Sequence, residues 1–360
     1  MFSRRFTIRA GRYIFDPEYR RENQLSLRGR QAALYEPQFE VDACGIGMIA
    51  NLNNTKSHEL VDQAVEILIN LTHRGAAGSD GKTGDGAGIL MQMPDAFMRG
   101  VTKAEGIELP PEGEYGVGVL FLRSDDGVQR EAQTIIEKVT VARGHEFLGW
   151  RTVPVDSTAI GELARQKEPV TKQFFIKKSS RYTNRDHFER ELFLVRKQME
   201  HDLRSASLDI PEDVYFVSFS ANTVIYKGLL LADQVHPYFP DLIDSRMSSA
   251  IALVHQRFST NTFPEWELAQ PFRYLCHNGE INTLQGNVNW MAAREALLSS
   301  PHFGEDVRHL HPVVRAGASD SACFDNVLEL LHMGGRSLPH AMMMMIPEAW
   351  EQDHRLTQER

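Results

Sequence analysis

The 360-residue sequence has few cysteines and no long apolar run. Cys44, Cys276 and Cys323 are far apart and odd in number, so they give neither a disulfide framework nor the paired spacing of a zinc or iron–sulfur site. No run of about 18 apolar residues occurs, and arginines stand at the N-terminus where a secretory signal needs an apolar centre. These absences predict a cytoplasmic protein with no membrane segment and no bound metal.

The charge balance excludes another class of function. The formal net charge is -9, whereas a general nucleic-acid-binding protein needs a basic face for phosphate. A composition of 42% hydrophobic and 24% charged residues is typical of a globular protein with a sizeable core, in one large domain or two smaller ones. The sequence therefore favours chemistry on a small molecule, with no nucleic acid as partner.

The first 43 residues differ in composition from the rest. They contain eight arginines and six acids but no lysine, few aliphatic residues and no clear period. Arginine-rich N-termini can be organelle transit peptides, but six acids are too many for one. We therefore interpret residues 1–43 as a pro-segment or arm that is removed, so that Cys44 becomes the N-terminus of a domain over residues 44–360.

Hydrophobic periodicity after Cys44 predicts strands and long helices in one layered α/β or α+β domain, with no internal repeat. A run of four methionines near residue 343 is expected to fill core gaps. The two strands 214–220 and 223–227 are expected to form a hairpin. The other predicted strands are 45–52, 89–93, 115–122, 148–155, 173–177, 251–256 and 271–277, and the predicted helices are 58–71, 126–143, 184–204, 285–298 and 319–332.

A glycine-rich stretch covers residues 73–88, with six glycines in sixteen residues. Such a loop lets backbone approach a ligand closely. A phosphate-binding loop is disfavoured, because the stretch has neither G-x-x-x-x-G-K-[ST] nor G-x-G-x-x-G and follows a predicted helix instead of a strand.

Four positions attract attention, although each also has a structural explanation. Cys44 can be a buried small hydrophobe at the start of a strand. Asn278-Gly279 between two predicted strands is a strong signal for a type I′ turn. Arg257 can be a solvated or locally paired arginine, and Asp320 can be the N-cap of the helix that follows it.

Four longer strings argue for a shared function of these positions. They are CGIGMIANL, HRGAAGSDGKTGDGAGI, HQRFSTNTFPEWELAQPFRYLCHNGEINTLQGN and GASDSACFDNVLELL. In this order they resemble the class II glutamine amidotransferase domain at the N-terminus of the glutamate synthase large subunit, over Cys44 to about Trp350. The resemblance implies the α+β fold of the N-terminal nucleophile hydrolases, a four-layer αββα sandwich. It also implies hydrolysis of L-glutamine to glutamate and ammonia.

The resemblance assigns catalytic roles to three residues. Cys44 would be the nucleophile, with its own α-amino group as the base once residues 1–43 are removed, because that amine has an ordinary pKa near 8. Asn278 and Gly279 would donate hydrogen bonds to the oxyanion.

Substrate binding is assigned to four more residues in the same way. Arg257 would bind the α-carboxylate of glutamine, and Asp320 its α-ammonium group. Thr260 would add a hydrogen bond from the same loop as Arg257, and Arg74 would order the nucleophile pocket.

The chain departs from the family pattern at its C-terminus. The strands and the Asn-Gly-Leu-Arg-Pro-type string that follow position 350 in the family are not found, so we expect a C-terminally truncated domain or fragment. The FMN, the iron–sulfur cluster and a small reductase subunit of the full enzyme belong with synthase domains that are absent here. The competing hypothesis is a catalytically silent module that binds glutamine. Another class II amidotransferase, for amino sugars or purines, is disfavoured by the Thr-Gly-Asp-Gly-Ala-Gly and Gln-Arg-Phe-Ser-Thr-Asn-Thr strings.

Overall fold

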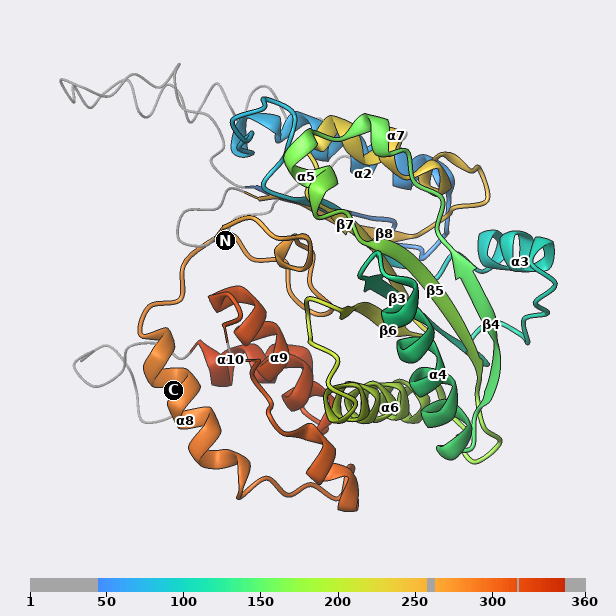
Figure 1. The fold of residues 1–360 in the computed structure, drawn as a ribbon, viewed down its shortest axis with the longest axis vertical. Coiled ribbons are helices and arrows are strands. Elements are labelled where there is room, and N and C mark those ends of the chain that lie inside the picture. The colour runs from blue at the N-terminus through green and yellow to red at the C-terminus, as the bar shows by residue number, and fades with distance from the viewer. Residues whose placement is uncertain (1–44, 258–262, 316, 347–360) are drawn as a thin grey trace, which may run out of the picture. The chain divides into compact units, whose positions relative to one another are not determined.

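A computed structural model describes residues 45–257, 263–315 and 317–346 of the chain. These residues all belong to one compact unit, Cys44–Arg360. Cys44 and Thr260, two of the residues assigned above, lie outside the described residues. Within the described part the strands form two antiparallel four-stranded sheets, with helices on their outer faces (Figure 1).

The first sheet has the strand order β1-β8-β2-β7. Its helix α2, His58–Asn70, packs its apolar side on β1 and β8 and begins at the N-cap Ser57. Short helices α5 and α7 lie on the same side of the sheet (Figure 1). The bounds are β1 Ile46–Ala50, β8 Ile251–Gln256, β2 Ala87–Gln92, β7 Thr223–Gly228, α5 Glu162–Gln166 and α7 Val235–Tyr238.

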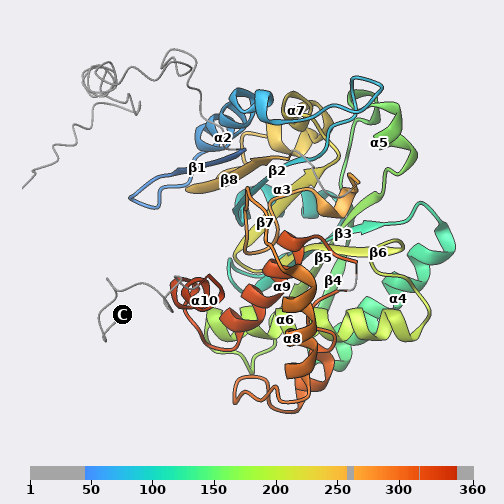
Figure 2. The same cartoon turned by 90° about the vertical axis from the view of Figure 1, so that its left-hand side faces the viewer.

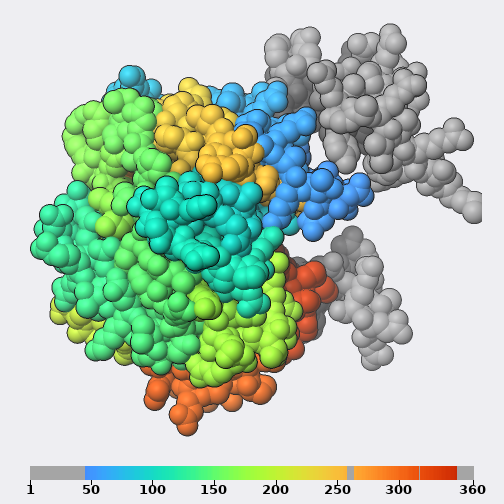
Figure 3. Space-filling view, turned by 90° about the vertical axis from the view of Figure 1, so that its right-hand side faces the viewer, coloured from blue at the N-terminus to red at the C-terminus, as the bar shows by residue number. Residues whose placement is uncertain are grey.

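The second sheet has the order β4-β5-β3-β6 and carries two long helices, α4 and α6, on its outer face. Apolar side chains of both sheets meet in one core between them, which makes the unit an αββα sandwich. Helix α3 lies on the face shown in Figure 3. The bounds are β3 Tyr115–Leu122, β4 Glu146–Thr152, β5 Val170–Lys177, β6 Val214–Ser220, α3 Asp95–Ala104, α4 Asp126–Ala142 and α6 Arg185–Ser205.

The C-terminal third of the described chain adds three helices beside α6 (Figure 2). They are α8 Leu284–Glu295, α9 Asp320–Met333 and α10 Leu338–Met345. Helix α9 packs on α10 and buries its face in two small apolar clusters. Helix α8 has no buried residue, and its Trp290 is 70% exposed.

Three sequence predictions are wrong. β6 and β7 do not form a hairpin, because they belong to different sheets and Ala221-Asn222 carries the chain from one sheet to the other. Residues 271–277 form no strand, since side chains instead of a neighbouring strand bind their backbone. The methionine run does not fill the core as a whole: Met343 and Met344 on α10 are exposed, whereas Met342 and Met345 are partly buried against a small apolar cluster.

Candidate active site

Arg257 directly follows β8, and its position is set by backbone hydrogen bonds to the glycine-rich stretch. Its N–H donates to the Gly86 carbonyl at 2.8 Å, and its Nη1 donates to the Asp85 carbonyl at 3.3 Å. Burial lowers the pKa of the guanidinium, while Asp85, Asp320 and Glu267 oppose that change. Arg257 is thus a buried cation (8% exposed) that Asp320 is close enough to influence.

The start of β1 lies against the end of β8. The antiparallel register pairs Ile46 with His255, and the Gln256 N–H donates to the Gly45 carbonyl at 2.8 Å. A Cβ on Gly45 would lie 2.5 Å from the Gln256 carbonyl oxygen and 3.3 Å from Asn278 Oδ1. Gly45, Gln256 and Asn278 are therefore immediate neighbours, and only glycine fits at position 45.

The loop that carries Asn278 and Gly279 is held through the residue before it. The carboxamide of Gln270 binds both backbone groups of His277, accepting from its N–H at 2.8 Å and donating to its carbonyl at 3.0 Å. His255 Nε2 also donates to that carbonyl, at 3.1 Å. Burial lowers the pKa of His255 to about 4, so its ring is neutral near pH 7. Asn278 and Gly279 themselves are exposed.

The same loop is tied to the start of α9. Ser319 is the N-cap of this helix and Asp320 its first residue, which corrects the alternative that Asp320 is the cap. Asp320 Oδ2 accepts from the Ile281 N–H at 2.8 Å, and its Oδ1 accepts from the Ser321 N–H at 2.6 Å. A carboxylate has about four acceptor positions, so Asp320 keeps capacity for a further donor.

The type I′ turn expected at Asn278-Gly279 is not formed. That turn needs positive φ at both central residues, and neither residue has one. No strand flanks the loop among the described residues on either side. The Asn-Gly pair is instead the exposed tip of a loop whose base is held by Gln270 and Asp320.

Arg74 ends a short 3₁₀ turn, Thr72–Arg74, directly before Gly75, which lies against the Gln256 side chain. Its Nε is buried without a hydrogen-bond partner among the described residues, and so are both polar atoms of the Gln256 carboxamide. A Cβ on Gly75 would lie 2.3 Å from Gln256 Nε2. Gln256 is 1% exposed, and the sequence analysis did not single it out. Its signal in the sequence is a polar residue at the end of an apolar strand, directly before Arg257.

The glycine-rich stretch packs against other segments of the same chain. Asp80 accepts from Thr83 Oγ1 at 2.6 Å and from the Thr83 N–H at 2.8 Å, which closes the turn. A Cβ on Gly84 would lie 2.1 Å from the Leu230 carbonyl, and one on Gly88 would lie 2.5 Å from Lys227 Cβ. Those two glycines thus permit close approach to neighbouring chain segments, which agrees with the argument against a phosphate loop.

The described ranges are 45–257, 263–315 and 317–346. They contain no group of three His, Cys, Asp or Glu residues placed to bind a metal ion. None of their helices is long and apolar enough to cross a membrane.

The chain belongs to the class II glutamine amidotransferases. The sequence model of this family matches residues 44–360, nearly all of the chain after the arginine-rich segment. The match confirms the predicted class of protein and its α+β sandwich fold.

Curated relatives narrow the comparison to glutamate synthases. The chain is 46% identical over 327 residues to the glutamate synthase [NADPH] large chain of Bacillus subtilis, which covers 91% of this chain and 21% of that protein. It is 43% identical over 352 residues to the glutamate synthase [NADH] of Schizosaccharomyces pombe, covering 95% and 16%. The chain thus spans about a fifth of the length of these relatives.

Proposed function

We propose that residues 44–360 form the glutamine-hydrolysing domain of a glutamate synthase, with Cys44 as the nucleophile after removal of residues 1–43. One observation carries the proposal. Gly45 lies against Gln256 and Asn278, so two of the four strings, about 200 residues apart in the sequence, meet at the residue that follows Cys44. Cys44 itself lies outside the described residues, and its place beside this junction is part of the proposal.

The reaction begins with the thiol of Cys44. Its α-amino group, free only after cleavage of the Ala43–Cys44 bond, takes the proton directly or through a water, because its ordinary pKa is near the working pH. The thiolate attacks the carboxamide carbon of glutamine and forms a tetrahedral oxyanion. The Asn278 amide and the Gly279 N–H stabilise that oxyanion, and the loss of one such donor typically costs about 3–4 kcal/mol. The α-ammonium group of Cys44 returns the proton to the leaving nitrogen, the C–N bond breaks and ammonia leaves. Water then hydrolyses the thioester, which releases glutamate and restores the Cys44 thiol.

Substrate selection rests on the two ends of the α-amino acid. Arg257 presents a guanidinium fork to the α-carboxylate, and its burial strengthens that interaction because the local dielectric is low. Asp320 receives the α-ammonium group with its remaining acceptor capacity. Thr260 and Arg74 are assigned supporting roles, Thr260 as a further hydrogen-bond partner and Arg74 in ordering the pocket around the nucleophile.

The proposal for the longer protein is separate. The relatives' names give NADPH or NADH as electron donor, and others are ferredoxin-dependent. We propose that ammonia made here serves a glutamate synthase reaction on 2-oxoglutarate in domains beyond this chain, where FMN and an iron–sulfur cluster would be bound. This chain alone would supply ammonia and glutamate.

Intact mass, N-terminal sequencing and a glutamine hydrolysis assay test the proposal together. We expect loss of residues 1–43, and glutamate release that the Cys44→Ala variant abolishes. Glutamate release by Cys44→Ala at the wild-type rate would refute the assignment. Calorimetric titration with glutamine separates the alternative, because a silent module would bind glutamine without turnover in the processed form.

A further inference from the structure

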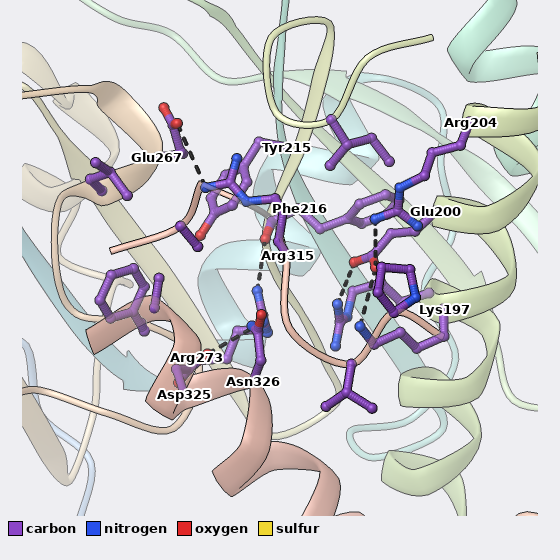
Figure 4. A pocket seen from close by; sticks show the side chains of 18 residues that line it. Lys197, Glu200, Arg204, Tyr215, Phe216, Glu267, Arg273, Arg315, Asp325 and Asn326 are labelled. Atoms are coloured by element: carbon purple, nitrogen blue, oxygen red, sulfur yellow. Dashed lines mark hydrogen bonds and ion pairs between the residues drawn. The ribbon is translucent and has the colours of Figure 1, made fainter. Parts of the chain in front are cut away.

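A small cavity lies between α6, α9 and the segments around residues 270 and 315 (Figure 4). Its volume is about 40 Å³. None of the described residues assigned above to catalysis or glutamine binding lines it. Side chains from four separate parts of the chain reach it, among them Arg204, Tyr215, Arg315 and Asn326.

Three of these side chains donate no hydrogen bond to another described residue. The carboxylate nearest to Arg315 is Glu267, at 3.9 Å, which is too long for a hydrogen bond. The Tyr215 hydroxyl and the Asn326 carboxamide also make no hydrogen bond within the described part of the chain. Burial raises the pKa of Tyr215 to about 12, so its hydroxyl keeps its proton and remains a donor.

The walls of the cavity carry a surplus of positive charge. Five cationic side chains line it against three carboxylates, and Glu329 behind the wall pairs with two of the cations. One positive charge therefore remains without a carboxylate, even when Glu329 is counted. Arg204 is exposed and Arg315 is half-buried, so this surplus charge is partly solvated, and a bound oxyanion would place a counter-charge beside it. The cations are Arg196, Lys197, Arg204, Arg273 and Arg315, and the carboxylates are Glu200, Glu267 and Asp325.

We propose that this cavity binds a small oxyanion of a few heavy atoms, a carboxylate or an inorganic phosphate. The volume corresponds to about three waters, which sets the upper size. A guanidinium fork, a phenol hydroxyl and an amide N–H₂ all donate to oxygen, and charge-assisted bonds from Arg315 would be the strongest of them.

The walls of this oxyanion site continue into the candidate active site. Glu267 stands three residues before Gln270, whose carboxamide holds His277 in front of the Asn278 loop. Arg315 stands five residues before Asp320. A bound oxyanion would restrain both segments. This coupling rests on the proposed function, whereas the binding itself does not.

Thermal unfolding of the full chain tests the binding without reference to turnover. Sodium phosphate and sodium acetate are each titrated against sodium chloride at equal ionic strength. Phosphate or acetate at a hundred times its dissociation constant should raise the unfolding midpoint by about 5 °C over chloride. The variant Arg315→Gln should lose this rise, while Arg308→Gln, which removes an exposed arginine outside the cavity, should keep it.

A second variant guards against misfolding of the first. Tyr215→Phe keeps the buried ring and removes only the hydroxyl, so it should weaken oxyanion binding about tenfold. The proposal would be overturned if phosphate and acetate raised the unfolding midpoint no more than chloride does. It would also be overturned if they raised the midpoints of wild type, Arg315→Gln and Tyr215→Phe equally. If glutamine hydrolysis failed but the Arg315-dependent shift persisted, the oxyanion site would stand and the proposed function would fall.

Discussion

Glu189 of α6 offers a quantitative test of how the two sheets are joined. Its carboxylate is 8% exposed, and Oε1 accepts from Ser220 Oγ at 2.7 Å and from the Ala221 N–H at 2.6 Å. Arg185 Nη2 donates to the Ala221 carbonyl at 3.1 Å. These side chains bind the backbone where the chain passes from β6 to β7. Burial raises the pKa of Glu189 to about 7. The hydrogen bonds that its carboxylate accepts and the positive charge of Arg185 act in the opposite direction, but burial has the larger effect.

The sign and size of the effect follow from that pKa. Between pH 4.5 and 7 the unfolded chain has lost the Glu189 proton while the folded chain keeps it, so the free energy of unfolding falls as pH rises. A difference of about 2.5 between the two pKa values corresponds to about 3 kcal/mol. The contribution is fully present below pH 4.5 and is lost above pH 7.

The variant Glu189→Gln removes the titration and keeps an oxygen acceptor. Relative to wild type, its free energy of unfolding should increase by about 3 kcal/mol between pH 4.5 and 8. Urea unfolding followed by tryptophan fluorescence at several pH values measures this difference. Glu131→Gln, at an exposed position of α4, is the control and should show no comparable trend. Parallel pH curves for wild type and Glu189→Gln would refute the reasoning.

Four further perturbations test the site and its supports. Arg257→Lys should raise KM for glutamine about 10- to 100-fold with kcat little changed, because lysine lacks the bidentate fork; a change in kcat alone would contradict the carboxylate role. Asn278→Ala should lower kcat about 100- to 1000-fold, and wild-type kcat would exclude it as an oxyanion donor. Gly75→Ala should cost about 1–3 kcal/mol in urea unfolding, since its Cβ would lie 2.3 Å from Gln256 Nε2; unchanged stability would show that the carboxamide can move. Burial lowers the pKa of Lys227 to about 7, so from pH 7 to 9 the unfolded chain binds one more proton than the folded chain. The free energy of unfolding of the wild type should therefore rise by about 1.4 kcal/mol per pH unit over this range, and that of Lys227→Met should not. Equal slopes for the two proteins would contradict the lowered pKa.

Much of the fold could be predicted from local periodicity. The strands 115–122 and 251–256 have the predicted bounds, and the predicted helices around α2, α4, α6, α8 and α9 differ by a few residues at most. These elements have one apolar face, or are apolar throughout, so the pattern of buried residues appears directly in the sequence. Helix α3 was missed, because its ten residues include a glycine and only three buried side chains.

The errors arose where long-range contacts override local pattern. A two-residue link between strands is typical of a hairpin, but nothing local shows that Glu189 and Arg185 will bind that link and let the strands enter separate sheets. The apolar segment 271–277 lies beside Gln270 and Asp325, whose side chains replace a neighbouring strand. Met343 and Met344 of α10 are exposed because the helix turns only Ala341, Met342 and Met345 toward an apolar cluster.

The candidate site was predictable as a set but not in its supports. Arg257, Asn278, Gly279 and Asp320 stood out through long strings, and the roles assigned to them remain proposals. Gln270 stood in the same strings without a distinguishing pattern, since a glutamine that binds backbone looks like any other polar residue. Gln256 had only its place at the end of an apolar strand as a signal. Only the three-dimensional contacts distinguish these two glutamines from other polar residues.

The pairing of Ile46 with His255 has a consequence for protein engineering. Because side chains alternate along a strand, one residue inserted or deleted between Gly45 and Gly47 would exchange the two faces of β1. Gly47 would then leave its place against Ile67, and the start of the domain would shift by about 3.4 Å along β8. The exposed turn at Leu52-Asn53, just beyond the same strand, pairs with no neighbouring strand, so it has no register to keep. Tags or extra residues should therefore be tolerated at that turn, whereas the first residues of β1 must keep their number.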